Sequence, residues 1–249
     1  MRIAIQGLAK RYGLTTVLDI PAFTIEAGER LGLVGNNGAG KTTFLRLVLD
    51  LIEASAGQVA IDGENVAAGA AWKKNTGSYL DEGFLIDYLT PEEYFAFTGA
   101  VYGLTRDQVD ERLERYAPFF NHEILGQNKY IGDLSQGNMK KVGIVAALLP
   151  EPRLLLLDEP FANLDPSTQI RLKNALVELE QGEEITLIVS SHDLNHVTEV
   201  CQRIAILERG CIVQDLQTSE HTLKDLQDYF AVGEDRPSTA SPTSEEEIL

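Results

Sequence analysis

Unbroken runs of apolar residues alternate with helix-like segments through much of the chain. Three such runs, at residues 31–34, 154–157 and 185–189, each stand beside a segment with helical periodicity. Continuous apolar runs of this length are typical of parallel strands that are covered on both faces, whereas strands with one face in water alternate apolar and polar residues. The pattern therefore predicts an α/β core built around a parallel sheet.

The first sixty or so residues follow a different pattern. Residues 2–6 and 17–25 alternate or cluster apolar side chains, and residues 58–63 form a short apolar segment that ends in an Asp-Gly turn. Such strands are typical of an antiparallel sheet that is partly exposed. We therefore expect an antiparallel β subdomain at the N-terminal side of the core.

Helix start signals dominate the middle of the chain. Thr90 and Thr105 each open a capping box, in which the threonine is followed three residues later by Glu or Gln. We expect residues 84–149 to form an α-helical subdomain, inserted into an α/β core that consists of residues 1–83 and 150–215.

The last part of the chain is polar and acidic. Residues 233–249 contain two prolines, several serines and threonines and a run of three glutamates. Because such a segment has too few apolar side chains to bury, it predicts a disordered tail. A short helix is expected before the tail, at about 222–230, so the folded domain is expected to span residues 1–232.

A glycine-rich loop follows the apolar run at 31–34. It fits the phosphate-loop pattern G-x-x-x-x-G-K-[ST], and a helix is expected to begin near its lysine. In such a loop the backbone amides bind phosphate oxygens, the lysine reaches the β- and γ-phosphates, and the Thr hydroxyl can ligate Mg²⁺. The candidate residues for binding a nucleoside triphosphate are Gly35, Asn36, Asn37, Gly38, Ala39, Gly40, Lys41 and Thr42.

Two acidic residues follow the apolar run at 154–157. Asp158 and Glu159 stand at the carboxyl end of an expected parallel strand, which is where α/β sheets bind ligands. We expect Asp158, together with Thr42, to hold Mg²⁺ and Glu159 to polarise the attacking water. The alternative is a pair of surface acids that cap the strand.

Two further segments carry candidate phosphate contacts. His192 follows the apolar run at 185–189 and is a candidate contact for the γ-phosphate, although a capping or packing role is the alternative for a lone histidine. Ser135 opens another helix as an expected N-cap, and Gly137 allows a close backbone approach. This helix start can bind a second anion or be an ordinary capped helix.

In this order, these segments resemble the nucleotide-binding domain of ATP-binding cassette (ABC) transporters over about residues 2–230. Tyr12 stands where that family stacks an aromatic ring on adenine. The segments that resemble family motifs are 35–43 (Walker A, which ends at Thr43), 134–138 (the signature), 154–159 (Walker B), 163–165 (the D-loop) and His192 (the switch histidine).

The resemblance implies a P-loop NTPase with a RecA-like core that hydrolyses ATP with Mg²⁺. It implies catalytic roles for Lys41, Glu159 and His192. It also implies a head-to-tail dimer, in which Ser135 and Gly137 of one subunit cap the γ-phosphate bound to Lys41 of the other. The second subunit is either a copy of this chain or a related cassette.

The same resemblance implies a membrane partner. Members of the family receive a segment of their permease beside the region that corresponds here to about Asp81 to Phe97, and the apolar residues of that region alternatively pack inside the helical subdomain. The pattern is most similar to the ATPase subunits of bacterial exporters with separate membrane chains. Such a subunit is expected at the cytoplasmic face of the cell membrane.

Two departures from the family pattern stand out. An acid, Asp81 or Glu82, occupies the place of the family's glutamine loop, so one of the two becomes a further candidate metal ligand. The signature has Gln136 and Asn138 where Gly and Gln are usual, but it keeps Ser135. We therefore expect the phosphate cap to work.

Charge and composition narrow the alternatives. The net charge of the 249 residues is −17, which opposes binding to nucleic-acid phosphates. A nucleic-acid-associated ABC ATPase is therefore disfavoured, and no nucleic-acid partner is expected. A soluble ABC ATPase that works in an assembly or regulatory complex has the same core chemistry and stays the main alternative. Two cysteines, Cys201 and Cys211, are expected to be packing thiols rather than a disulfide.

Overall fold

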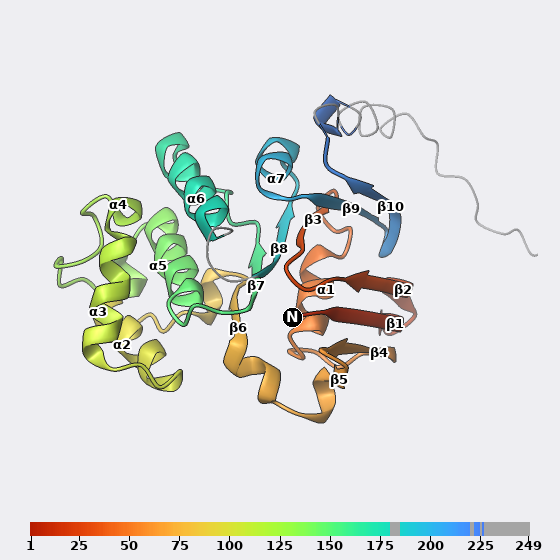
Figure 1. Cartoon of the computed structure of the whole chain (residues 1–249), viewed down its shortest axis with the longest axis horizontal. Helices are drawn as coiled ribbons and strands as arrows, with labels where there is room; N and C mark the ends of the chain where they lie inside the picture. Colours follow the sequence, from red (N-terminus) through yellow and green to blue (C-terminus); the bar gives the residue numbers. More distant parts are fainter. Residues whose placement is uncertain (180–184, 220–221, 225, 227–249) are drawn as a thin grey trace, which may run out of the picture.

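The computed structural model describes residues 1–179, 185–219, 222–224 and 226. These residues form two β-sheets with helices between them and beside them (Figure 1). The expected tail at 233–249 lies outside the described residues, as does most of the expected helix at 222–230.

The larger sheet has six strands in the order β10-β9-β3-β8-β7-β6. All neighbours pair in parallel except β10 with β9, so the predicted parallel core is confirmed. The strands of this sheet are β3 (Arg30–Val34), β6 (Thr76–Tyr79), β7 (Leu154–Asp158), β8 (Thr186–Ser191), β9 (Arg203–Glu208) and β10 (Cys211–Gln217).

The smaller sheet has four strands in the order β2-β1-β4-β5, all antiparallel. It corresponds to the expected N-terminal β subdomain, although its first two strands are longer than the sequence pattern predicts. The strands are β1 (Ile3–Tyr12), β2 (Thr15–Ile25), β4 (Ala56–Ile61) and β5 (Glu64–Asn65).

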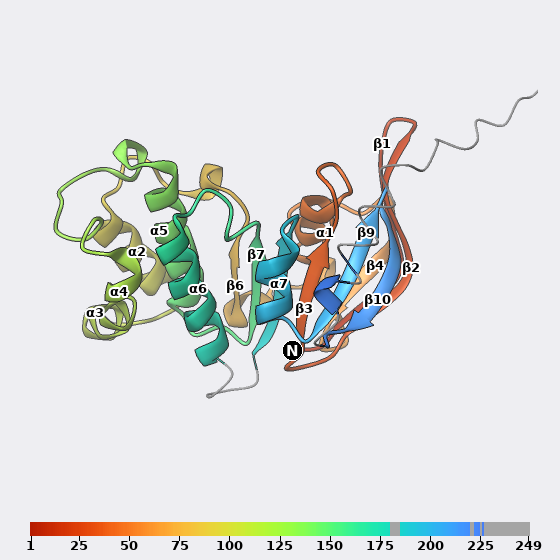
Figure 2. The ribbon, with the colours of Figure 1, turned by 90° about the horizontal axis from the view of Figure 1, so that it is seen from above.

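Four helices, α2 to α5, lie between β6 and β7 in the chain. Figures 1 and 2 show α2, α3 and α4 together at the end of the molecule farthest from the smaller sheet. Both predicted capping boxes are present, at the starts of α2 and α3. The α-helices are α1 (Lys41–Val48), α2 (Pro91–Val101), α3 (Arg106–Arg115), α4 (Ala117–Phe120), α5 (Gln136–Leu148), α6 (Pro166–Glu178) and α7 (Leu194–Val200), and the short 3₁₀-helices are Val66–Ala68, Ala71–Asn75, Glu82–Phe84 and Ile131–Asp133.

The larger sheet is buried on both faces. Alternate residues of β7 enter two different cores: Leu154 and Leu156 pack with α1 and the smaller sheet, while Leu155 and Leu157 pack with α5 and α6. Side chains alternate between the faces of a strand, so a strand that is covered on both sides needs an apolar residue at every position. This explains the unbroken leucine run. The subdomain boundaries at 83/84 and 149/150 stay a prediction.

The strand order decides where the functional loops meet. β8 lies between β3 and β7, with Ser191 paired to Val34 and Ser190 paired to Asp158. The loops that leave β3, β7 and β8 therefore leave the sheet at the same edge. Neighbouring carboxyl ends of parallel strands form the usual ligand site of an α/β sheet.

Candidate functional site

The loop of residues 35–40 connects β3 to α1 and leaves the first amides of α1 free. Gly40 is the N-cap residue of α1, and no side chain caps these amides. By contrast α2, α3, α5, α6 and α7 each have a side-chain cap. Uncapped amides at a helix N-terminus carry partial positive charge, so this helix start is suited to bind an anion.

Glycine is required at two positions of this loop. A Cβ atom on Gly35 would lie 2.3 Å from the carbonyl oxygen of Leu207, which is backbone and cannot move aside easily. Gly40 has φ +109°, a conformation that residues with a side chain rarely adopt. The glycines therefore let the loop pass close to β9 and turn into α1.

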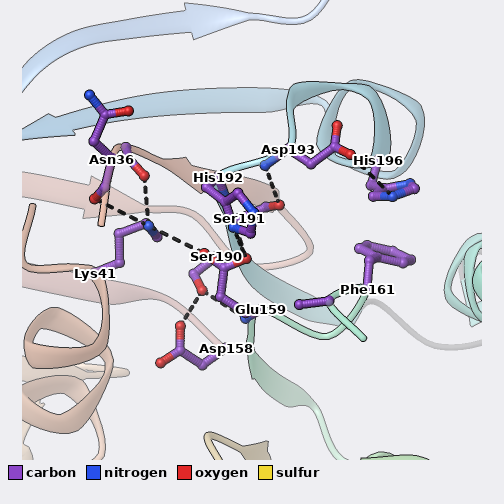
Figure 3. Close-up of polar contacts among 12 residues, drawn as sticks. Asn36, Lys41, Asp158, Glu159, Phe161, Ser190, Ser191, His192, Asp193 and His196 are labelled. Carbon is purple, nitrogen blue, oxygen red and sulfur yellow. Dashed lines mark hydrogen bonds and ion pairs between the residues drawn. The ribbon is translucent and has the colours of Figure 1, made fainter. Parts of the chain in front are cut away.

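Lys41 reaches back over the loop from the start of α1. Its side chain is buried, and its Nζ atom donates hydrogen bonds to the carbonyl oxygens of Gly35 at 2.6 Å and Asn36 at 3.5 Å. The same Nζ lies 3.3 Å from Oε1 of Glu159 (Figure 3). The ammonium group therefore stands between the phosphate loop and the carboxylate that follows β7.

Asp158 ends β7 and accepts two hydroxyl hydrogen bonds. Thr42 Oγ1 donates to Oδ2 at 2.5 Å, and Ser190 Oγ donates to Oδ1. Burial raises the pKa of Asp158, although both hydroxyl groups act in the opposite direction. A buried carboxylate of this kind is stabilised by a nearby cation.

The Thr42 and Asp158 oxygens fit a magnesium ion. Mg²⁺ prefers oxygen ligands and is usually bound by one or two protein groups together with substrate phosphates and water. The described residues contain no group of three or more His, Cys, Asp or Glu side chains that could enclose a metal ion by themselves. A shared site, in which protein and substrate both supply oxygens, therefore suits this pair better than an all-protein cage.

Glu159 has an unusual backbone and a tightly held carboxylate. Its φ is +46°, which for a residue other than glycine costs of order 1–3 kcal/mol and is typical of functional sites. His192 Nδ1 lies 2.8 Å from Oε2, whereas no donor among the described residues makes a hydrogen bond to Oε1, which has only the ion pair with Lys41. Oε1 of this carboxylate thus faces the Lys41 ammonium beside the phosphate loop.

Within the described residues, no hydrogen bond or ion pair joins Ser135 or Gly137 to this cluster. Ser135 is exposed and accepts a hydrogen bond from the Asn138 amide, so it is the N-cap that the sequence predicts. A Cβ on Gly137 would lie 3.2 Å from the carbonyl oxygen of Asn163. Neither residue contacts Lys41, and the phosphate-binding role of this helix start stays a prediction.

Tyr12 ends β1, and its ring is half exposed with Lys10 Nζ 4.9 Å from its centre. An open ring face suits stacking on a base, but that role also stays a prediction.

The two acids at the family's glutamine position are engaged elsewhere. Asp81 pairs with Arg46 at 3.3 Å and accepts a hydrogen bond from the Gly83 amide. Glu82 accepts a hydrogen bond from the Tyr79 hydroxyl at 2.8 Å. Neither carboxylate contacts Thr42 or Asp158 in the described contacts, and a metal role for either stays a prediction.

The structure adds two residues that sequence reasoning did not single out. Besides binding Asp158, Ser190 accepts a hydrogen bond from the Glu159 amide with both its carbonyl oxygen, at 3.2 Å, and its hydroxyl, at 3.0 Å. Lys140 of α5 donates to the carbonyl oxygen of Glu159 at 3.0 Å. The Ser190 hydroxyl is predictable once β7 and β8 are paired, but nothing in the local sequence indicates the reach of Lys140.

Comparison with known proteins decides the family. A family model described as "ABC transporter" matches residues 18–162. The ABC transporter ATP-binding protein NatA of Bacillus subtilis (strain 168) is 32% identical over 206 residues, which are 82% of this chain and 82% of NatA. The chain belongs to the ABC transporter family. It is an ATP-binding subunit of that family and an ATPase.

Two further matches bear on this ABC subunit. The Fe(3+) ions import ATP-binding protein FbpC of Escherichia coli O157:H7 is 29% identical over 212 residues, and the match covers 85% of this chain but only 61% of FbpC. A solved structure of the ATP-binding subunit of an ABC transporter has a TM-score of 0.78 and 28% identity, with 93% of this chain and 94% of that chain covered. The P-loop NTPase fold predicted from the sequence is therefore confirmed.

No helix among the residues that the structure describes is both long and apolar enough to span a membrane.

Replacement of Ser190 by alanine tests whether this hydroxyl supports the catalytic pair. Ser190→Ala removes a donor to buried Asp158 and an acceptor for the Glu159 amide, which costs about 1–3 kcal/mol and predicts roughly a 10-fold lower kcat for ATP hydrolysis. Phosphate release at saturating ATP measures the effect.

Ser191→Ala is the matched control, since Ser191 is equally buried but accepts from Asp193 instead. Equal losses of kcat in the two variants would contradict the role given to Ser190.

Proposed function

We propose that this chain is the ATP-hydrolysing subunit of an ABC exporter and that it works as a head-to-tail dimer on a membrane partner. The observation that carries the proposal is the separation of two phosphate-binding elements within one chain. Lys41, Asp158 and Glu159 form one cluster, while the exposed Ser135 lies outside it. In a head-to-tail dimer, Ser135 and Gly137 complete the nucleotide site of the neighbouring subunit.

Each residue of the cluster then has a definite task. The free amides of α1 and the Lys41 ammonium bind and orient the β- and γ-phosphates, and Tyr12 stacks on the adenine. Thr42 and Asp158 would hold Mg²⁺, which would neutralise negative charge on the phosphate oxygens. Glu159 accepts a proton from the attacking water, and His192 holds the glutamate by its 2.8 Å contact.

The proposed step starts from an ion pair that must rearrange. Lys41 lies 3.3 Å from Glu159 Oε1, so the ammonium occupies the side of the carboxylate that faces the phosphate loop. Phosphate oxygens compete for the same ammonium, so nucleotide binding draws Lys41 away. Glu159 Oε1 then loses its ion-pair partner and can accept a hydrogen bond from the attacking water only when substrate is bound.

The membrane partner is proposed to dock beside Asp81 to Phe97. A cavity of about 280 Å³ opens there, and its lining includes Phe84, Phe97 and Val101. These three side chains are each more than half exposed. A segment of a permease that covers these side chains would hold the chain at the cytoplasmic face of the membrane. The same complex would contain a second cassette, which forms the dimer with this chain.

Export is the proposed direction, and it needs its own experiment because the related FbpC is named for import. The complex of this chain with its permease is reconstituted in proteoliposomes with ATP outside, and candidate substrates are added on one side of the membrane at a time. An exporter should hydrolyse ATP faster when its substrate is on the ATP side. Stimulation only by compounds enclosed in the lumen would indicate import instead.

The substitution Glu159→Gln tests the catalytic assignment and the dimer together. The amide side chain keeps the size of glutamate but cannot accept the proton, so hydrolysis should fall about 10²- to 10⁴-fold while ATP binding persists. With ATP and Mg²⁺ the variant should accumulate as a dimer in light scattering after gel filtration.

Lys41→Ala is the companion variant for the binding half of the site, and it should lose both ATP binding and the ATP-dependent dimer. Wild-type hydrolysis by Glu159→Gln, or a monomer at saturating ATP, would overturn the proposal.

Replacement of Phe97 by aspartate tests the docking face. Phe97→Asp places a charge on the proposed contact and should reduce recovery of a polytopic membrane protein at least about 10-fold, as for a central interface residue. Val213→Asp on β10 is the control, since Val213 is similarly exposed but lies on another element. Recovery of only cytosolic proteins by the unaltered chain would favour the assembly-complex alternative.

A further inference from the structure

Lys140 lies in the second turn of α5, the helix that begins at Ser135, and its side chain is buried. The exposed fraction of the residue is 5%. Its Nζ atom donates to the carbonyl oxygen of Glu159 at 3.0 Å and to that of Ala162 at 2.8 Å, and it lies 6.0 Å from the centre of the Tyr79 ring. The ammonium thus binds two backbone groups of the loop that follows β7.

This position is unfavourable for a lysine by itself. Burial lowers the pKa of Lys140, although the carboxylates of Glu82, Glu159 and Asp158 act in the opposite direction. The next residue, Lys141, is equally buried but forms an ordinary ion pair with Glu123 at 3.3 Å. The two lysines therefore differ in their partners: Lys141 pairs with a carboxylate, whereas Lys140 donates hydrogen bonds to backbone carbonyl oxygens.

That stretch of backbone carries the catalytic glutamate. Glu159 has the left-handed φ of +46°, and its amide is bound to Ser190 on one side. The bond from Lys140 to its carbonyl oxygen holds the other side, and the bond to Ala162 closes the loop just before Asn163, which also has positive φ. A residue with strained backbone keeps its conformation only when its surroundings over-determine it.

We propose that Lys140 is a positioning residue that fixes the backbone of Glu159 and links it rigidly to the helix that carries Ser135 and Gly137. The link rests on the proposed head-to-tail dimer. In that dimer Ser135 binds the nucleotide of one site, while Glu159 of the same chain serves the other site. A shift of α5 upon phosphate binding at the first site therefore reaches Glu159 of the second site through the Lys140 side chain.

The substitution Lys140→Met tests this role, because methionine keeps the length and apolar stem of lysine but donates no hydrogen bond. We expect kcat for ATP hydrolysis to fall about 10- to 100-fold through misplacement of Glu159, while the KM for ATP stays within about 2-fold. The Hill coefficient of hydrolysis should fall towards one. Lys140→Arg, which can still donate to both carbonyl oxygens, should restore part of kcat.

Lys141→Met is the matched control. It removes an equally buried lysine from the same helix turn, and its kcat should stay within about 2-fold of the wild-type value because the ion pair that it loses, with Glu123, does not involve the Glu159 loop. Thermal unfolding of each variant shows whether the folded fraction accounts for any loss.

Three results would overturn the inference: wild-type kcat in Lys140→Met, equal losses in Lys140→Met and Lys141→Met, or a loss of ATP affinity that matches the loss of kcat. If Lys140→Met does not fold, Lys140→Arg and Lys140→Ala carry the test, since the alanine side chain donates no hydrogen bond, and equal kcat values in these two would overturn it.

The proposed function is tested separately by Glu159→Gln. Inactive Glu159→Gln together with fully active Lys140→Met would reject the role of Lys140 alone.

Discussion

The pairing of β7 with β8 is the constraint on which the site depends. It sets Asp158 opposite Ser190, so one serine binds both the carboxylate of Asp158 and the amide of Glu159. A slip of one residue would turn the Asp158 side chain to the opposite face of the sheet. Because β7 and β8 have apolar residues on both faces, most of their side chains would still be buried after such a slip. The hydrogen bonds at the strand ends therefore help to define the register.

Several charged side chains lie close together at this edge of the sheet. Lys41, Asp158 and Lys140 are all buried, and Glu159 lies among them. Buried ionisable groups are expensive unless each has partners. In this cluster nearly every described polar atom has a hydrogen-bond partner. The exception is Glu159 Oε1, whose contact within the described residues is the ion pair with Lys41, and a phosphate would compete for that ammonium. The cluster is therefore stable by itself and still able to rearrange around a nucleotide.

The arrangement also explains why one chain is expected to be incomplete. The residues proposed to bind phosphate and activate water converge from β3, β7 and β8, whereas Ser135 is exposed at the start of α5. Lys140 connects α5 to the Glu159 loop through a single side chain. In the proposed dimer, this link would let the two nucleotide sites communicate through one helix without a large change of fold.

Local sequence patterns by themselves determined the α/β class, the antiparallel N-terminal sheet, the phosphate loop and the identity of Asp158 and Glu159 as candidate chemistry. These features are predictable because hydrophobic periodicity, capping boxes and glycine-rich turns act over a few neighbouring residues. Only the tertiary structure decided that Ser190 serves Asp158 across 32 positions of sequence and that Lys140 supports Glu159 across 19. Such contacts depend on how helices and strands far apart in the chain pack, and a hydrogen bond forms or fails within a few tenths of an ångström.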